Sequence, residues 1–574
     1  MDLARQLIGE CVHGHKLCKH LSTPPSLLPT RLVDCTDPAH PRLVFTSGQH
    51  GEYFALSYVW GEDQLYKTTK STALLYMQGF DPYILPQTVR DAISVTHALG
   101  FKYLWVDALC IIQNGEVDRQ HEIGHMHHIY RHATLTIFAA STASASEGFL
   151  HEREPSYEST PDLIMPFICP PSSTSAGVLD RRPVSQLQLG HIHLLSENSV
   201  TSSYRDTLGV MATRAWCMQE YLLSPRALIF TATSLLFRCR TGTIRGVGNS
   251  AHRWFREPRL PDTLFLRDPP AAEPGSKEWT DTNKAWLEVV RDYSCRSATL
   301  ESDRLVACAA VAQQFARVLG CDYLAGFWRS NVLLNDLLWQ CDRITTKHKP
   351  RRPAAYLAPS WSWAVARNVY YISYRSPSWP EDIALAEVIL SRCEVTLKDP
   401  SLPFGEVTGG TLVLRGMAIS CRSRSPGPRD SRYHLEVVIP SYEDAHRPHW
   451  GLGLGDSNSD AENTGDSGTP EEYTVGISLD YPDADELPRQ MWLVPFLKTS
   501  NHISGLAMLP VDPPLSGLDS EPDRKTIRFQ RVGLFRYADW NTLKVLEHPL
   551  WGPLVRAIQD KDTRAQVWRD IVIV

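Results

Sequence analysis

The segment from residue 53 to residue 140 constrains the fold most, because strand-like and helix-like patterns alternate along it. The apolar β-type runs lie at 53–60, 103–112 and 134–139, and helical apolar spacing lies between them at 86–99 and 120–133. A nearly unbroken apolar run is typical of a strand that is covered on both faces. The alternation therefore predicts an α/β domain with a parallel sheet flanked by helices.

The rest of the chain changes character twice. Apolar residues at helical spacing dominate 281–319, and short β-type runs punctuated by glycine and proline follow after Trp363. Whether those strands form a sandwich or a barrel stays open. The expected parts are an N-terminal helix and lead-in (1–50), the α/β domain (51–240) with a loop insertion at about 152–186, a helical subdomain (281–345) and a β-rich C-terminal region (355–574) with a disordered loop at about 451–472. The overall class is mixed α+β.

Composition limits the classes of function. A chain of 574 residues with 43% hydrophobic content can form two or three domains with their own cores. The net charge of −6, with both signs interspersed, offers no basic face, so nucleic-acid binding is not expected. No run approaches the roughly 20 apolar residues of a membrane span, and residues 1–16 lack the apolar centre of a signal peptide. Thirteen scattered cysteines fit a reducing compartment, and we expect a soluble cytoplasmic protein.

Several sequence blocks in a fixed order resemble the heterokaryon incompatibility (HET) domain of filamentous fungi. The blocks of the N-terminal segment are Ala55 to Gly61, Leu85-Pro86, Asp91 to Ile93, Tyr103 to Gln113, Glu122, Met126, Ile129-Tyr130 and Ala133. Further blocks typical of such chains are Arg214 to Glu220, Arg304-Leu305, Gly326 to Trp328 and Pro359 to Ala364. The resemblance implies a fungal protein of non-self recognition that triggers programmed cell death, with other incompatibility proteins as partners.

HET domains have been considered distant relatives of TIR domains, and residues 54–63 are similar to the first strand and loop of a TIR domain. Some TIR domains cleave the nicotinamide–ribose bond of NAD with a glutamate. The resemblance thus implies NAD as a candidate substrate, and no other cofactor is indicated. No position matches the glutamate-bearing helix, so Glu122 and Glu147 are both candidates and the catalytic status of the chain stays open.

The ends of the first two core strands are the predicted ligand site, because crevices in open parallel sheets form outside the carboxyl ends of the strands. Trp60 could stack on a planar ligand, Gly61 would allow close backbone approach, and Asp107 could bind hydroxyl groups. The alternative is that Trp60 is a core aromatic and that Asp107 caps a turn. The candidate ligand-binding residues are Ser57, Tyr58, Trp60, Gly61, Cys110, Gln113, Arg214 and Trp216. The apolar flanks of Cys110 favour a buried, inert thiol over a nucleophile.

Three carboxylates are the catalytic candidates: Asp107, Glu122 and Glu220. Both glutamates lie in apolar neighbourhoods, where loss of water would raise the carboxyl pKa towards a value useful in acid–base catalysis. For Glu220 the favoured alternative is a structural ion pair with Arg214 or Arg226.

Two histidine motifs suggest metal chemistry. His121-Glu122-Ile123-Gly124-His125 matches the zinc-protease pattern, but no third ligand is evident. In a helix, Glu122 would face the core with Met126, while the histidines would lie on a face more exposed to solvent. This favours a chance match of the motif on a structural helix over a zinc site. Near the N-terminus, Cys11, His15 and Cys18 are spaced four and three apart, so they would share one helix face. Zinc binding and the burial of two thiols both explain that spacing; the second is favoured, and no metal site is predicted.

Two other classes of function stay open. A chain without a nucleotide-switch loop but with sixteen tryptophans could be a small-molecule biosynthetic enzyme of secondary metabolism, such as a cyclase or isomerase, whose partner is a small-molecule ligand. Such an enzyme would use a pocket between the α/β and helical parts. A non-catalytic interaction module would instead show an exposed apolar patch.

Overall fold

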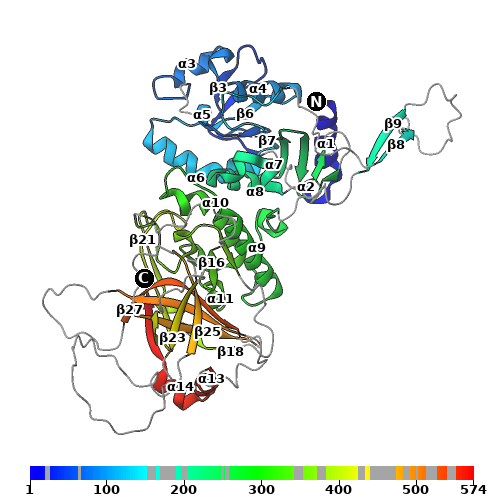
Figure 1. Cartoon of the computed structure of the whole chain (residues 1–574). Helices are drawn as coiled ribbons and strands as arrows, with labels where there is room; N and C mark the ends of the chain where they lie inside the picture. The colour runs from blue at the N-terminus through cyan, green and yellow to red at the C-terminus, as the bar shows by residue number, and fades with distance from the viewer. Residues whose placement is uncertain are drawn as a thin grey trace, which may run out of the picture. The chain divides into compact units, whose positions relative to one another are not determined.

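The computed structural model divides into two compact units, residues 1–265 and residues 266–574, which we describe separately (Figure 1). The described residues are 1–19, 26–61, 66–151, 163–168, 189–194, 203–241, 244–246, 251–252, 257–341, 353, 355–371, 383–423, 434–439, 473–481, 490–499, 502–511, 527–538 and 551–574. Among them, no helix is both long enough and apolar enough to cross a membrane.

The first unit is built on a nine-stranded sheet whose centre is parallel and whose two sides are antiparallel. The parallel strands, in spatial order, are β10 (Arg226–Phe230), β7 (Leu135–Ala139), β5 (Phe54–Ser57) and β6 (Tyr103–Trp105). Beyond β10 lie β11 (Leu235–Cys239), β12 (Ile244–Gly246) and β13 (Ala251–His252), and beyond β6 lie β2 (Arg31–Asp34) and β3 (Arg42–Phe45). The predicted parallel sheet is thus confirmed for its centre, whereas the whole sheet is mixed. Short connections such as the one between β10 and β11 allow only antiparallel pairing.

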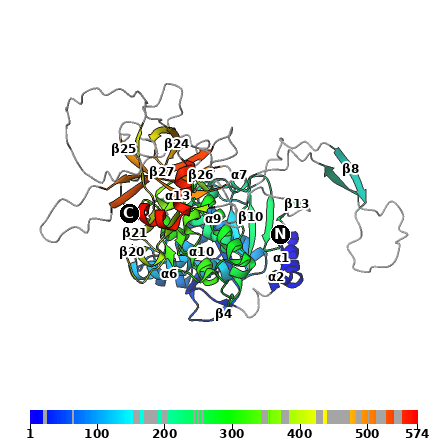
Figure 2. The ribbon, with the colours of Figure 1, turned by 90° about the horizontal axis from the view of Figure 1, so that it is seen from below.

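Helices pack around this sheet, including the two that apolar spacing predicted at 86–99 and 120–133. The helices of the unit are α1 (Asp2–Gly14), α2 (Lys16–Lys19), α3 (Ala73–Gln78), α4 (Gln87–Ala98), α5 (Asp107–Cys110), α6 (Glu116–His132), α7 (Tyr204–Leu208) and α8 (Ala215–Leu223). Both views place α1 and α2 beside the β10–β13 side of the sheet (Figures 1 and 2). In α6, Glu122 and Met126 are buried while His121 and His125 are exposed, as the periodicity predicted.

One predicted strand is wrong in its second half. The apolar run at 103–112 is a strand only as far as Trp105, and α5 begins at Asp107. The Asp107 Oδ1 atom accepts a hydrogen bond from the Ala108 N–H at 2.7 Å, which favours the helical turn. Ala108 and Cys110 are buried, so the unbroken apolar run reports burial and not a strand.

The predicted loop insertion at about 152–186 contains a strand. Within it, β8 (Leu163–Ile168) pairs antiparallel with β9 (Leu189–Leu194) in a hairpin. Pro166 lies in the middle of β8, and a proline normally argues against a strand unless that strand lies at an edge. The remainder of the predicted insertion lies outside the described residues.

The second unit begins with a helical layer rich in tryptophan. Its helices are α9 (Lys277–Tyr293), α10 (Asp303–Leu319) and α11 (Leu333–Asp336), with short strands β14 (Tyr323–Leu324), β15 (Phe327–Trp328), β16 (Trp339–Cys341) and β17 (Val369–Tyr371). The Gly326 carbonyl accepts hydrogen bonds from the indole N–H groups of Trp286 and Trp363, at 3.0 and 2.8 Å. These tryptophans are fully buried. The indoles that suggested an aromatic ligand pocket here are core residues.

Six antiparallel strands of the C-terminal region close into a ring. Their order around the ring is β25 (Gln490–Lys498), β22 (Ile419–Ser423), β23 (His434–Ile439), β24 (Tyr473–Leu479), β27 (Ile527–Ala538) and β26 (His502–Pro510), which pairs again with β25. Outside the ring lie β18 (Ile383–Ala384), β19 (Ala386–Val388), β20 (Glu394–Leu397), β21 (Val407–Gly416) and β28 (Arg569–Ile573). This confirms the β-rich region and selects the closed arrangement over the sandwich. The predicted disordered loop at 451–472 lies outside the described residues.

A helix and a buried ion pair complete this unit. Helix α13 (Trp551–Gln559) contributes Trp551 and Leu554 to the apolar core of the ring strands, and α14 (Lys561–Val567) follows it. Arg531 of β27 pairs with Asp480 and donates hydrogen bonds to the carbonyls of Leu337 and Trp339, both at 2.6 Å. The ring and the tryptophan-rich layer are therefore joined through buried charge.

Candidate functional site

The carboxyl ends of β5 and β6 meet in a polar cluster. Ser57 is the last residue of β5, and Asp107 follows β6 by two residues. The Trp60 indole Nε1 donates a hydrogen bond to the Asp107 Oδ2 atom at 2.8 Å. Adjacent parallel strands end at the same edge of a sheet, which is why residues 47 positions apart in the chain come together here. The predicted proximity of the two strand ends is confirmed.

Glu220 enters the same cluster from α8. Its Oε2 atom accepts a hydrogen bond from the Ser57 hydroxyl, and both side chains are buried. The Tyr130 hydroxyl of α6 donates to the Leu56 carbonyl at 3.0 Å and lies close enough to Glu220 for each to affect the other's pKa. Two strands and two helices thus surround one buried carboxyl group.

Burial shifts the pKa values of the ionisable side chains in this cluster. Loss of water is the main reason that the pKa of Glu220 is raised to about 7; the Asp107 charge also raises it, while the Ser57 hydroxyl and the Arg214 cation lower it. Burial also raises the pKa of Asp107, against the hydrogen bond from Trp60. The pKa of Tyr58 is raised strongly by burial and by Asp107. At neutral pH, Glu220 is therefore divided between its acid and base forms, as a general acid–base group requires.

Arg214 is the cation of the cluster. It immediately precedes α8, and its charge lowers the pKa values of both Glu220 and Asp107. Arg226, the other predicted partner of Glu220, instead donates to the Cys18 carbonyl at 2.9 Å. Trp60, Asp107, Arg214 and Trp216 are partly exposed, while Ser57 and Glu220 are buried. A ligand would therefore reach the partly exposed residues first.

Glu122 lies in a different network. Arg31 is 3.5 Å from the Glu122 Oε1 atom, binds the Asp118 carboxylate at 2.7 and 2.8 Å, and donates to the Cys110 carbonyl at 2.6 Å. Glu122 and Arg31 are both buried, so this is a structural ion pair. The Glu122 Oε1 atom lies 3.6 Å from the His121 Nδ1 atom, but among the described residues His121, Glu122 and His125 do not form a set of three possible metal ligands.

The remaining predicted residues shape the strand ends. Burial raises the pKa of Cys110 to about 12, which leaves an inert thiol at neutral pH. The Gln113 side chain donates to the Asp107 carbonyl at 3.0 Å and so helps to fix the α5 turn. Glu147, the other candidate glutamate, is exposed and accepts a hydrogen bond from the Ala143 N–H at 3.0 Å.

Gly61 packs directly on the turn at residues 143–147. Its φ is +72°, and a Cβ atom there would lie 2.5 Å from the Ser144 Cβ and 2.8 Å from the Ser144 Cα. We expect Gly61→Ala to lower the free energy of unfolding by about 2 kcal/mol or more, because backbone strain adds to the overlap. Urea denaturation checks this, with Gly124→Ala as the control. Nothing lies within 4 Å of a Cβ at Gly124, so that helical substitution should be neutral or stabilising; equal losses in both variants would contradict the argument.

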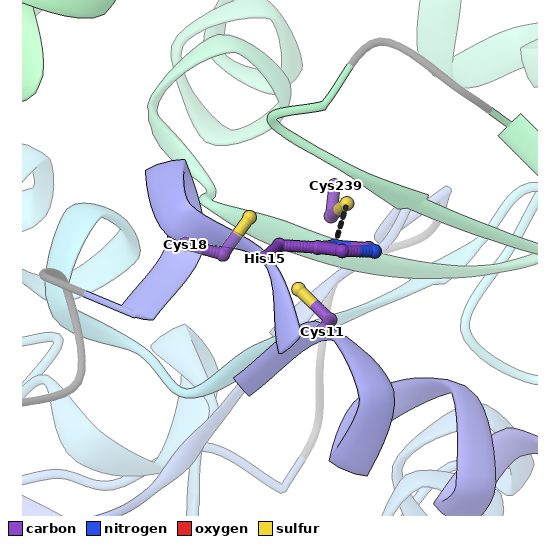
Figure 3. Close-up of side chains that lie close together, drawn as sticks. All are labelled: Cys11, His15, Cys18 and Cys239. Atoms are coloured by element: carbon purple, nitrogen blue, oxygen red, sulfur yellow. Dashed lines mark hydrogen bonds between the residues drawn. The ribbon is translucent and has the colours of Figure 1, made fainter. Parts of the chain in front are cut away.

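A second polar cluster involves the predicted Cys11, His15 and Cys18. The helical backbone is interrupted at His15, so the three residues do not share one continuous helix face as expected. The structure adds Cys239, the last residue of β11, and all four potential ligand atoms lie within 4.8 Å of one another (Figure 3). Cys239 lies 224 positions from His15, and nothing in its local sequence marked it.

Residues 53–220 match the family described as "Heterokaryon incompatibility protein (HET)". The matched segment begins just before β5 and ends at Glu220, so it contains the whole Ser57–Asp107–Glu220 cluster. Residues 53–220 of the chain are therefore similar to the HET family, as the ordered blocks implied. Neither a curated protein nor a solved structure matches the chain.

Proposed function

We propose that this HET-domain protein acts in non-self recognition and programmed cell death, and that its first unit does so by cleaving NAD at the Ser57–Asp107–Glu220 cluster. The single observation that carries the catalytic part is the buried Glu220 carboxyl, whose pKa of about 7 suits acid–base work. It lies at the carboxyl ends of parallel strands, where α/β sheets bind ligands. The cluster also falls entirely inside the segment that matches the HET family.

The reaction makes demands that these residues can meet. Water adds to the ribose C1′ atom, the C–N bond breaks, and its electron pair goes to the nicotinamide nitrogen and cancels the positive charge there. One proton of the water goes to a base, and the products are nicotinamide, ADP-ribose and a proton. A carboxylate near C1′ stabilises the positive charge that develops on the ribose in the transition state.

Each residue takes a role that follows from its position. Ionised Glu220 is the base, and the Ser57 hydroxyl orients it through their hydrogen bond. The partly exposed Trp60 indole, fixed by Asp107, offers a flat surface for the nicotinamide ring. Arg214 supplies positive charge for the pyrophosphate of NAD.

NAD consumption by the purified full-length chain tests the proposal. We expect Glu220→Gln to lower kcat by about 10² to 10⁴-fold, and Trp60→Ala to raise KM. The wild-type rate should rise with pH through about 7 because the base form of Glu220 is needed. Glu122→Gln, a buried glutamate of the same domain outside the cluster, is the control and should keep kcat wherever it remains folded.

Three outcomes would redirect the proposal. Selective loss of turnover in a folded Glu122→Gln variant would transfer the catalytic role to α6. No turnover by the wild type at any protein concentration would rule out NAD cleavage by this chain alone. If fungal cells that express the inactive Glu220→Gln variant still arrest growth, the response does not depend on catalysis.

Growth arrest caused by the inactive variant would favour the other class of function, a non-catalytic interaction module. One exposed surface supports that class. The segment at residues 74–83 exposes large apolar side chains: Leu74 is 74% exposed, Leu75 60% and Tyr83 80%. Neighbouring apolar residues so open to water are typical of partner contacts. In the part of the chain that the structure describes, no comparable observation favours the small-molecule biosynthetic enzyme, because most tryptophans there are buried in the core.

A further inference from the structure

We propose that Cys11, His15, Cys18 and Cys239 bind one structural zinc ion that fastens the N-terminal helices to the sheet. The inference does not depend on the proposed NAD cleavage. All four residues lie outside the segment that matches the HET family.

The spacing of the four side chains fits tetrahedral zinc. With Zn–S bonds of about 2.3 Å and a Zn–N bond of about 2.0 Å, neighbouring ligand atoms lie about 3.5 to 3.8 Å apart. The Cys239 Sγ and His15 Nδ1 atoms are 3.5 Å apart, and all four ligand atoms fall within 4.8 Å of one another. In Figure 3 the three sulfur atoms surround the imidazole edge, with two sulfurs from α1 and α2 and one from β11.

The site is closed, as structural zinc sites are. Three thiolates and one imidazole fill the four positions of a tetrahedral ion, which leaves no position for water or a substrate. Cys11, Cys18 and Cys239 are buried, and only His15 is partly exposed. Sulfur-rich tetrahedral donor sets favour zinc over magnesium or calcium, which prefer oxygen ligands.

The surroundings supply the outer contacts that such a centre needs. Three thiolates and Zn²⁺ carry a net charge of −1, and the buried Arg226 Nε lies 3.3 Å from the Cys11 Sγ atom. The Arg226 guanidinium also holds the Cys18 carbonyl, which fixes α2. The Thr241 hydroxyl lies 3.2 Å from the Cys239 Sγ atom and can donate a hydrogen bond to its thiolate. Second-sphere donors of this kind orient thiolate ligands.

A metal ion would stabilise the N-terminal helices, which bury few apolar side chains. The buried face of α1 consists of Ala4, Ile8 and Cys11, and α2 is only four residues long. A single ion bound by α1, by the break at His15, by α2 and by β11 would cross-link four points of the chain. The rival explanation is a disulfide, but three thiols allow only one bond and leave one sulfur unpaired.

The test is the metal content of the full-length chain, purified without a metal-affinity column. We expect about one zinc ion per chain by plasma mass spectrometry, and Cys239→Ser should lose most of it. Cys35→Ser is the matched control: Cys35 is a buried thiol of the same unit whose Sγ contacts the Val33 carbonyl instead. The control should keep the wild-type zinc content.

Cobalt exchange of the wild type keeps the test independent of how well the variants fold. We expect the visible spectrum of tetrahedral Co²⁺ together with thiolate-to-cobalt charge transfer, and release of the ion on adding strong chelators should lower the melting temperature. Wild-type protein that binds neither ion after reduction would overturn the proposal. So would a Cys239→Ser variant that keeps a full zinc ion, or mass spectrometry that finds a disulfide among the three cysteines in protein isolated under reducing conditions.

Discussion

Glu220→Gln is expected to make the first unit more stable than the wild type at pH 8, by up to about 3 kcal/mol. Burial raises the pKa of Glu220 from an ordinary 4.5 to about 7, and each unit of pKa difference corresponds to about 1.4 kcal/mol. Because the folded-state pKa is the higher one, the folded protein holds this proton more tightly. Its stabilising contribution is complete below about pH 4.5 and is lost as the pH rises through about 7. Glutamine stays neutral throughout, and the Ser57 hydroxyl can still donate to it.

Hydrogen exchange read on peptides of the first unit at pH 5 and pH 8, after correction for the intrinsic rates, would measure this effect. The wild type should lose protection free energy between the two pH values, and Glu220→Gln should lose less. Glu116→Gln, at an exposed position on α6, is the control and should follow the wild type. A Glu220→Gln unit no more stable than the wild type at pH 8 would show that the buried carboxyl is fully compensated. Stabilisation combined with lost turnover would mean that Glu220 serves activity at the expense of stability.

Asp480→Ala is expected to lower the unfolding free energy of the second unit by about 3 to 5 kcal/mol. Asp480 accepts hydrogen bonds from Arg531 Nε at 2.9 Å and from its Nη2 at 3.2 Å, and both side chains are almost completely buried. The guanidinium also stacks 3.4 Å from the centre of the Trp339 ring. Removing the carboxylate leaves a buried cation whose charge is no longer compensated. The two carbonyls that it also binds cannot replace that charge.

Thermal and urea unfolding, with exchange read on peptides of the second unit, would measure this loss. Asp570→Ala is the matched control, since Asp570 pairs with Arg392 and Arg415 at a partly exposed surface and should cost no more than about 1 kcal/mol. Replacing both buried partners, as Asp480→Ala with Arg531→Met, should be less harmful than Asp480→Ala alone. A loss below 1 kcal/mol for Asp480→Ala would mean that water or a neighbouring group compensates Arg531.

Periodicity and strand order predicted much of the HET-domain fold. The helices α4 and α6 and the strands β5 and β7 follow the apolar spacing, because each buries one face against its neighbours. That the two strand ends could lie side by side also followed, since parallel neighbours share an edge; the hydrogen bond between Trp60 and Asp107 was not predicted. The point at which the strand at 103–105 ends could not be predicted from the sequence, because a buried helical turn and a buried strand are equally apolar.

The choice between the two glutamates could not be made from the sequence. Glu122 and Glu220 both stand among apolar residues, and only the tertiary structure pairs Glu122 with Arg31, from a strand far earlier in the chain. The same holds for Cys239, which joins Cys11 and Cys18 because β11 lies beside α1. Local pattern carries no information about such distant partners.

The closed ring of the second unit limits how this part of the protein could recognise anything. A ring strand already has a neighbour on each side, so an incoming peptide cannot extend the ring as a further strand. Among the described residues, the sheet ends in β18, β19 and β20, which are two to four residues long. Such short edges offer few backbone hydrogen bonds. Any selectivity in this unit would therefore reside in side chains and connecting segments, which can change in sequence without disturbing the backbone ladder.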